Sequence, residues 1–414
     1  MELSEEQNAV ISDIESGKNV LITGSAGTGK STLLKAIREK LAIPVTASTG
    51  IAAVNVGGLT IHSWAGLGLG KGSAMEIAQN MRSESHFKIK DTPRLAIDEI
   101  SMISAELFTK IDQVFQLVRG NRLPFGGMQM ILLGDFLQLP PVIRNDSKEL
   151  LPREVFAFES PSWKQAEIRT CLLTKVFRQA DAGFSSVLNQ IRFGEITPGV
   201  SELLNSRFNA QDANPKLEPV IVHTHNADVD TINALRLAKV SGKEEIFEST
   251  DTGKPGPLAM LDKHCLAPKV LTLKIGAQVM LLCNIAPEAG LANGSIGTVV
   301  GFSEGDSGPL VKVFFNNGEV LNLGYAKWEI LDGSTVVARR RQIPLRLAWA
   351  ITAHKSQGMT LDKIQVFLAK CFEYGQSYVA LSRARTAEGL FVASGTRKSI
   401  KAHPLAVDFY RNNA

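Results

Sequence analysis

The segment GSAGTGKST at residues 24–32 combines residue types that bind phosphate. It fits the pattern GxxxxGK[ST] and lies between an apolar run typical of a strand and one typical of a helix, as this pattern requires. Glycines let backbone N–H groups curl around a phosphate at the helix N-terminus, the Lys30 ammonium reaches the β and γ oxygens, and the Ser31 hydroxyl binds Mg²⁺. We therefore predict a nucleoside triphosphate site with Mg²⁺, formed by Gly24, Ser25, Ala26, Gly27, Thr28, Gly29, Lys30, Ser31 and Thr32.

Asp98 and Glu99 follow another apolar run and supply the acidic partners that a phosphate loop needs. We expect Asp98, like Ser31, to hold the magnesium shell, and Glu99 to orient or deprotonate the attacking water. Acidic residues after a strand also cap helices, and without the phosphate loop the two interpretations would be equally good. Together with the loop, the catalytic interpretation is favoured.

Two glutamines have competing interpretations. Gln138, in GlyAspPheLeuGln at 134–138, is of the type that senses a γ-phosphate or positions water, whereas a polar turn before the two following prolines is the alternative. Gln7 forms a Ser-x-x-Gln capping box with Ser4, which stabilises a helix start without any nucleotide. From the pattern alone, capping is the favoured role of Gln7.

Apolar runs at 20–23, 95–97 and 130–133 predict strands of one sheet with these candidate residues at their carboxyl ends, where open α/β sheets bind ligands. Helices are expected at 4–15 and 32–41. We assign residues 1–65 and 93–175 to this first α/β lobe. Residues 66–92 are glycine-rich and then polar, which indicates a small insertion.

Weaker strand patterns at 219–223, 365–368 and 390–393 predict a second α/β lobe, covering 176–235 and 343–414. The region 236–342 is inserted into it. Within that region, short β-prone runs broken by AsnGly at 293–294 and 317–318 predict a small β-barrel at about 270–342. Residues 236–269 are placed as loop or insertion.

Length and composition agree with a two-lobed globular chain. A sequence of 414 residues exceeds what one core usually supports, and 44% hydrophobic with 21% charged residues is ordinary. No membrane span or secretion signal is expected, so a cytoplasmic location is predicted. Four scattered cysteines suggest neither a zinc site nor a disulfide framework. Lys and Arg concentrate in 336–401, and for ArgArgArg at 339–341 solvated surface is favoured over DNA contact or a barrel-edge cap.

A phosphate loop alone does not separate kinases, GTPases and motors. No AsnLysxAsp motif for guanine occurs, which weighs against a GTPase. Arg178 in PheArgGln and Arg383 in AlaLeuSerArg are candidates for arginine fingers, which stabilise charge on the transferred phosphoryl group. Taken singly, each would more often be a surface salt-bridge arginine.

Seven segments, in order along nearly the whole chain, closely resemble the petite integration frequency (PIF) family of superfamily one B helicases. They are TASTGIAA (46–53), GLTIHSW (58–64), LAIDEISMIS (95–104), PFGGMQMILLGDFLQLPPV (124–142), LTKVFRQ (173–179), ITAHKSQGMTLD (351–362) and YGQSYVALSRARTAEGL (374–390). The resemblance implies two RecA-like P-loop NTPase lobes. It also implies an ATP- and Mg²⁺-dependent monomeric DNA helicase that moves 5′ to 3′ on single-stranded DNA.

The same resemblance assigns roles to individual residues. Gln7 becomes an adenine contact, Arg178 and Arg383 become fingers, and Lys30, Asp98, Glu99 and Gln138 keep their catalytic roles. The family's DNA-backbone positions correspond here to Thr46, Ser48, Thr60, His62, His225, Asn226, His354 and Lys355. Trp64, Trp349 and Tyr378 could stack on bases, but core packing is the commoner role of such aromatics, and they stay unassigned.

Departures from the family pattern are mostly omissions. The segment 66–92, where relatives have a strand-separating wedge, is short, which puts unwinding power in doubt. The expected partners are single-stranded DNA and duplex with a 5′ single-stranded tail, while G-quadruplex DNA is a candidate that the residues leave open. Two alternatives also stay open: a RecD-like subunit of a nuclease complex, and an ATP-regulated nucleic-acid clamp that does not unwind.

Overall fold

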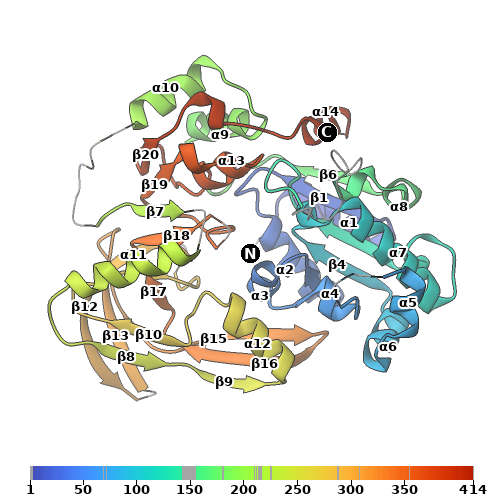
Figure 1. Ribbon diagram of the computed structural model, residues 1–414, viewed down its shortest axis with the longest axis horizontal. Helices are drawn as coiled ribbons and strands as arrows, with labels where there is room; N and C mark the ends of the chain where they lie inside the picture. Colours follow the sequence, from blue (N-terminus) through green and yellow to red (C-terminus); the bar gives the residue numbers. More distant parts are fainter. Residues whose placement is uncertain are drawn as a thin grey trace.

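A computed structural model of the chain describes residues 3–68, 70, 72–141, 155–179, 181–208, 210, 212, 217–223, 226–286, 289–306, 308–353 and 355–413. Two α/β lobes stand side by side, and a β-rich domain inserted in the second lobe extends beneath both (Figure 1). The predicted fold class, two RecA-like P-loop NTPase lobes with a small insertion in the first and a β-rich insertion in the second, is confirmed. The strands predicted to form a small β-barrel in that second insertion lie in separate sheets of five, three and two strands.

The first lobe is built on a six-stranded parallel sheet in the order β3-β2-β4-β5-β1-β6. The central strands are buried along their length, which is why they read as continuous apolar runs in the sequence. The predicted strands at 20–23, 95–97 and 130–133 are confirmed as β1, β4 and β5. The bounds are β1 Val20–Gly24, β2 Val45–Ala47, β3 Leu59–Thr60, β4 Arg94–Asp98, β5 Gln129–Leu133 and β6 Arg169–Leu173.

Helices cover this sheet, and α7 (Ala105–Arg119) illustrates why they form where they do. The Ser104 hydroxyl accepts the Leu107 N–H at the start, and Gly120, in the left-handed conformation with φ 62°, ends the helix. Its apolar face packs Phe108 and Phe115 against the core. The other first-lobe helices are α1 Glu5–Glu15, α2 Lys30–Leu41, α3 Gly50–Asn55, α4 Ile61–Trp64 and α8 Pro161–Gln165.

The insertion in the first lobe consists of two short helices, α5 (Ala74–Gln79) and α6 (Ser83–Asp91), which pack on α7. A capping box between Ser73 and Glu76 starts α5. Both helices lie at the lower right of the molecule in Figure 1.

The second lobe has a four-stranded parallel sheet in the order β18-β7-β19-β20. The three strands predicted for it are confirmed as β7, β19 and β20, whereas β18 joins them from a segment that gave no separate signal. The bounds are β7 Val220–His223, β18 Ala350–Thr352, β19 Ile364–Phe367 and β20 Leu390–Ser394, with helices α9 Ala182–Arg192, α10 Pro198–Arg207, α11 Asn226–Lys239 and α13 Gln376–Leu381.

The inserted domain centres on a five-stranded antiparallel sheet in the order β14-β13-β12-β11-β17. The AsnGly at 317–318 forms the turn between β13 and β14, with Gly318 at φ 91°. Strands β8 and β10 pair beside it and share its apolar core. The bounds are β8 Glu245–Glu248, β9 Thr250–Gly253, α12 Pro255–His264, β10 Val270–Leu273, β11 Gln278–Leu281, β12 Ile296–Gly305, β13 Gly308–Phe315, β14 Val320–Leu323, β15 Ala326–Asp332, β16 Thr335–Gln342 and β17 Leu345–Leu347.

Two features of this domain differ from the sequence expectation. Residues 236–269, placed as loop or insertion, contain regular elements because β8 and β9 pair with the distant strands β10 and β16, which local patterns do not reveal. The solvated-surface interpretation is wrong for Arg340, whose side chain is 1% exposed and ion-pairs with Asp251 and Asp262. It holds for Arg339, which pairs with Glu329 at the surface.

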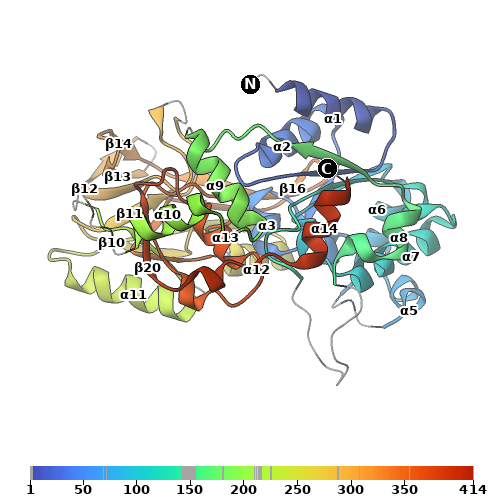
Figure 2. The same ribbon diagram turned by 90° about the horizontal axis from the view of Figure 1, so that it is seen from above.

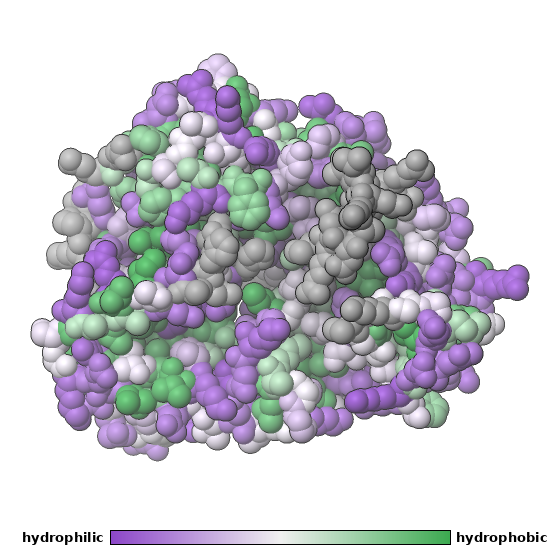
Figure 3. Space-filling model, in the orientation of Figure 1, coloured by the Kyte–Doolittle hydropathy of each residue, from purple (hydrophilic) through white to green (hydrophobic). Residues whose placement is uncertain are grey.

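The C-terminal helix α14 (Pro404–Asn413) returns to the first lobe, although the predicted range 343–414 assigns it to the second. Its Phe409 packs on Phe136 and Trp163 in the first-lobe core, and α14 lies next to α8 in Figure 2. On the face shown in Figure 3, hydrophobic side chains form small separate patches among hydrophilic ones. In the described part of the chain, every helix is too short or too polar to cross a membrane.

Candidate nucleotide site and nucleic-acid groove

The phosphate loop runs from the end of β1 to the start of α2. Gly27 and Gly29 have φ of 87° and 83°, a left-handed region that glycine adopts without strain. Gly29 is the N-cap of α2 and supplies no side-chain acceptor, so the first N–H groups of the helix face the loop. This arrangement fits a bound phosphate, because such N–H groups and the helix dipole both attract an anion.

Lys30 lies inside this cradle. Its Nζ donates to the carbonyl oxygens of Gly24, at 2.7 Å, and Ser25, at 2.9 Å. Burial lowers the pKa of Lys30 to about 8, although the carboxylates of Asp135 and Glu99 oppose this shift. A desolvated ammonium of this kind is stabilised by a nearby anion, as phosphate oxygens would provide.

The acidic pair lies at the end of β4, beside the phosphate loop. The Asp98 carboxylate accepts the Glu99 N–H at 2.9 Å, and Glu99 has a left-handed backbone at φ 54°. Burial raises the pKa of Asp98 to about 6, and burial together with the charge of Asp98 raises that of Glu99 to about 8. A carboxyl group with a pKa near neutrality is suited to proton transfer.

A cavity of about 340 Å³ brings together five of the six predicted catalytic residues, whereas Asp98 does not line it. Arg178, from the connection between the lobes, donates to the carbonyl oxygen of Gly358 at 3.1 Å. Arg383, which follows α13, is 1% exposed and donates to the carbonyl oxygen of Val379 at 2.8 Å. The predicted residues that line the cavity are Ala26, Gly27, Thr28, Gly29, Lys30, Ser31, Thr32, Glu99, Gln138, Arg178 and Arg383.

The charges in this cavity fit a polyphosphate. Burial lowers the pKa of both Arg178 and Arg383, so each guanidinium lacks full compensation for its lost hydration. Within the described residues, neither has a carboxylate at ion-pair distance. Since an isolated buried charge is costly, an anion between these arginines and Lys30 would stabilise the site.

Four residues that line the cavity were not predicted, and Gly358, the hydrogen-bond partner of Arg178, is one of them. The others are Phe177, Asn284 and Gln357, and the Nε2 of Gln357 is buried with no hydrogen-bond partner among the described atoms. Phe177 is 54% exposed, and its ring lies against Gly29. An exposed aromatic directly before a candidate finger was the signal that could have identified it.

Gln7 has the capping role that its pattern favours. The Ser4 N–H donates to Oε1 of Gln7 at 3.0 Å, and the Ser4 hydroxyl accepts the Gln7 N–H. The Nε2 of the same side chain faces Gly29, so Gln7 also borders the phosphate loop. Capping and nucleotide contact are therefore compatible.

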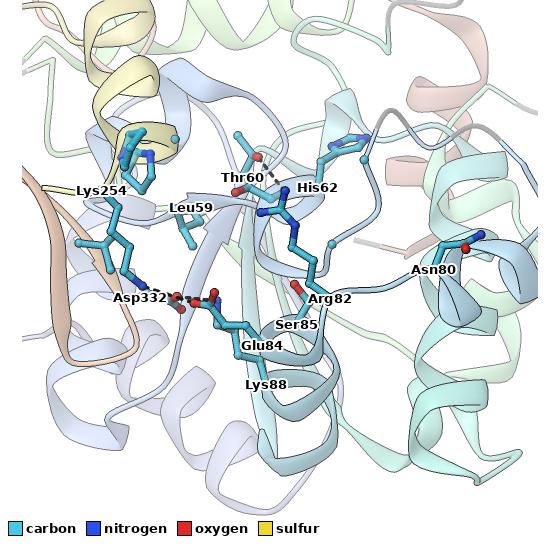
Figure 4. A pocket seen from close by; sticks show the side chains of 17 residues that line it. Leu59, Thr60, His62, Asn80, Arg82, Glu84, Ser85, Lys88, Lys254 and Asp332 are labelled. Atoms are coloured by element: carbon cyan, nitrogen blue, oxygen red, sulfur yellow. Dashed lines mark hydrogen bonds and ion pairs between the residues drawn. The ribbon is translucent and has the colours of Figure 1, made fainter.

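A larger cavity of about 840 Å³ lies between the first lobe, its insertion and the inserted domain (Figure 4). Two of the predicted DNA-binding residues, Thr60 and His62, line it. Two ion pairs span it: Lys88 with Asp332 at 2.5 Å and Lys254 with Glu84 at 3.6 Å. We call this cavity the interdomain groove.

The other residues predicted to bind DNA are dispersed. Thr46 is fully buried, and its hydroxyl donates to the carbonyl oxygen of Ala96, whereas the Ser48 hydroxyl donates to that of Glu99 at 2.8 Å. Lys355 is half-buried, and burial lowers its pKa. Asn226 begins α11, but its side chain lies outside the described structure, as do the whole of His225 and His354. Trp64, Trp349 and Tyr378 are buried in apolar cores, as expected.

Helix α12 of the inserted domain packs on the start of α3. A side chain at Gly50 would overlap the imidazole of His264, so only glycine permits this approach. The inserted domain therefore contacts the first lobe two residues beyond Ser48.

Comparison with known proteins matches two family models, "PIF1-like helicase" over residues 2–201 and "DNA helicase Pif1, 2B domain" over residues 258–302. The chain is 41% identical to the human ATP-dependent DNA helicase PIF1 over 99% of its own length, and it spans 63% of that relative. The chain thus covers somewhat under two thirds of its curated relatives.

Among solved structures, unliganded Pif1 from Bacteroides sp. superposes with a TM-score of 0.85 at 33% identity, covering 99% of this chain and 97% of the other. Bacteroides Pif1 bound to single-stranded DNA gives a TM-score of 0.65 at the same identity, covering 100% and 97%. Bacteroides sp. Pif1 in complex with ADP-AlF4 gives a TM-score of 0.84, so the two higher scores belong to structures whose names mention no DNA.

Proposed function

Since the chain belongs to the PIF1-like helicase family, we propose that it is an ATP-dependent DNA helicase that moves 5′ to 3′ along single-stranded DNA and unwinds duplex. One observation carries the proposal: Arg178 and Arg383 enter the phosphate-loop cavity from the side of the second lobe. An ATP site completed by a second lobe changes as the lobes close, and this is the property that a motor requires.

The chemistry follows from the roles that we propose for the cleft residues. The phosphate loop and Lys30 bind the phosphates, and Ser31 with Asp98 would hold Mg²⁺, which neutralises charge on the β and γ oxygens. Glu99 takes the proton of the attacking water, for which its raised pKa suits it. Gln138 positions that water, and both arginines stabilise charge on the transferred phosphoryl group.

Closure of the lobes is supported by contacts on both sides of the loop. The backbone N–H of Ala26 donates to the Tyr378 hydroxyl of α13 at 2.8 Å, and Arg178 donates to carbonyl oxygens of Gly358 and Ser382. A change at the γ-phosphate therefore acts on α13 and on the segment before it. This is our proposed route from hydrolysis to movement.

For the DNA track we propose Thr60 and His62 in the interdomain groove, with Ser48 and Lys355 at its continuation and His225, Asn226 and His354 from the second lobe. Burial lowers the pKa of His62, so it binds as a neutral imidazole. Hydroxyls and neutral imidazoles suit backbone contact without base readout. Thr46 supports this track from within the sheet, through its bond to Ala96.

We also propose that the protein acts as a monomer. It would load on single-stranded DNA or on duplex with a 5′ single-stranded tail, and its proposed location is the cytoplasm. A role on G-quadruplex DNA rests on family resemblance alone. Glu99 and the two arginines favour a motor that hydrolyses ATP over a clamp that uses ATP only to hold nucleic acid, because holding nucleic acid needs no catalytic base. A RecD-like subunit would differ by requiring partner chains for activity.

The test is steady-state ATP hydrolysis by the purified chain with and without oligo(dT). We expect strong stimulation by DNA and its loss in Lys30→Ala, with DNA binding retained. An Arg339→Ala variant serves as control, because the Arg339 side chain is exposed and ion-pairs with Glu329 at the surface. Absence of DNA stimulation in the unaltered chain would reject the proposal, and DNA-dependent function that survives Lys30→Ala would favour the clamp.

A further inference from the structure

The loop that carries Gln138 is oriented by a buried carboxylate. Asp135 is fully buried and accepts hydrogen bonds from the Leu137 N–H at 3.2 Å and from Nε2 of Gln138 at 3.3 Å. Asp135 thus fixes both the backbone of this loop and the amide of the residue that faces the ATP cavity.

A second-lobe arginine holds this carboxylate. Arg192, at the end of α9, donates through Nε and Nη2 to the two oxygens of Asp135, at 2.9 Å and 2.8 Å. Burial alone would raise the pKa of Asp135, but the charge and hydrogen bonds of Arg192 outweigh it and lower that pKa. A bidentate pair of this kind fixes orientation as well as distance, so the second lobe sets the position of the Gln138 loop.

The C-terminal helix completes the arrangement through Tyr410. The Arg192 guanidinium lies over the Tyr410 ring, 4.7 Å from its centroid. The Tyr410 hydroxyl accepts the Phe136 N–H at 3.1 Å and shares a 2.5 Å hydrogen bond with the hydroxyl of Thr23. Thr23 directly precedes the phosphate loop, so one buried phenol joins the end of β1 to the loop after β5.

We propose that Arg192 and Tyr410 are positioning residues for ATP hydrolysis, which hold the Gln138 loop at a fixed distance from the phosphate loop and connect both to the second lobe. This inference rests on the proposed function. Neither side chain lines the ATP cavity; both line a separate cavity behind the phosphate loop, beside Ser25. They therefore act through Asp135, Thr23 and the backbone of Phe136.

If Tyr410 served only to fill the core, its aromatic ring would be sufficient and its hydroxyl would not be needed. Here the hydroxyl satisfies a buried backbone N–H that would otherwise lose its partner, so removing it moves the strand ends rather than emptying the core. Catalysis depends on such positions steeply, because a displacement of about 1 Å costs about 10²-fold in rate.

The test compares Tyr410→Phe with Tyr325→Phe, a partly exposed tyrosine of the inserted domain whose ring lies under the Arg341 guanidinium and which does not line the ATP cavity. With saturating oligo(dT), we expect Tyr410→Phe to lower kcat for ATP at least about 10-fold, with KM within about 2-fold. Tyr325→Phe should behave as the unaltered chain. Arg192→Lys, which keeps the charge but loses the bidentate geometry, should match Tyr410→Phe.

Combination with Gln138→Ala separates positioning from general stability. If Tyr410 acts through the Gln138 loop, Tyr410→Phe should cause little further loss of kcat in that background. Equal losses in both backgrounds, or normal turnover in both Tyr410→Phe and Arg192→Lys, would overturn the inference while leaving the proposed function intact. Absence of ATPase activity in the unaltered chain would instead reject the proposed function itself.

Discussion

Gly27 of the phosphate loop touches Arg178, the candidate finger from the connection between the lobes. A methyl group at Gly27 would collide with Cβ of Arg178, and the Phe177 N–H donates to the carbonyl oxygen of Gly27 at 2.8 Å. The phosphate loop and the candidate finger Arg178 are therefore in direct contact, and the absence of a side chain at residue 27 permits this contact.

Gly27→Ala should reduce ATP hydrolysis by at least about 10²-fold, because the added methyl displaces both the loop and Arg178. Gly17→Ala is a matched control: Gly17 has the same φ of 87° but no atom within 4 Å of the added group. The control should be destabilised by only about 1 kcal/mol and stay active. Equal turnover in both variants, measured by coupled ATPase assay, would contradict the contact.

Arg383→Ala should lower kcat by at least about 10²-fold with affinity for single-stranded DNA nearly unchanged. The reason is that Arg383 lines the ATP cavity and its charge acts on Glu99. Thermal unfolding must accompany the kinetics, since the guanidinium is buried and bonds to the backbone of Val379. A folded Arg383→Ala protein with normal turnover would remove Arg383 as a finger.

The pH dependence of kcat/KM for ATP should be bell-shaped with an optimum near pH 8. Glu99 must be ionised to accept a proton, and its pKa is raised to about 8; Lys30 must be protonated to bind phosphate, and its pKa is lowered to about 8. Activity therefore rises with pH as Glu99 ionises and falls as Lys30 loses its proton. Because the two charges interact, both sides of the pH profile reflect the titration of Glu99 and Lys30 together. Glu99→Gln should abolish the rising limb, and a flat profile in the unaltered chain between about pH 6 and 8 would contradict the assignment.

Binding of oligo(dT) should weaken linearly on a plot of log K against log salt, with a slope of about −0.7 for each phosphate contacted. Fluorescence anisotropy at several salt concentrations provides the slope. Lys355→Ala should reduce its magnitude by about 0.7 if Lys355 contacts one phosphate. Binding that does not respond to salt would contradict a track along the DNA backbone.

Local sequence predicted the positions of the phosphate loop and of the acidic pair beside it. The phosphate loop, Asp98 and Glu99 lie at carboxyl ends of strongly apolar strands, and both the periodicity and the residue types of these segments are local signals. Arg178 and Arg383 were candidates from the sequence, but only the resemblance favoured a finger role, because a lone arginine has no local pattern that distinguishes a finger from a surface side chain.

Features that depend on distant contacts could not be predicted. The roles of Arg192 and Tyr410 arise from partners far along the chain, Asp135 and Thr23, and neither gave a sequence signal. Arg340 was placed at the surface because three consecutive arginines usually are solvated, yet the strand alternation of β16 turns its middle residue inward to Asp251.

Strand separation tests the central claim most directly, that this two-lobed ATP site drives 5′ to 3′ movement on DNA. The substrates are duplexes carrying either a 5′ or a 3′ single-stranded tail, with ATP or a non-hydrolysable analogue. We predict unwinding of the 5′-tailed duplex with ATP alone. Unwinding of the 3′-tailed duplex instead, or equal unwinding with the analogue, would contradict the claim.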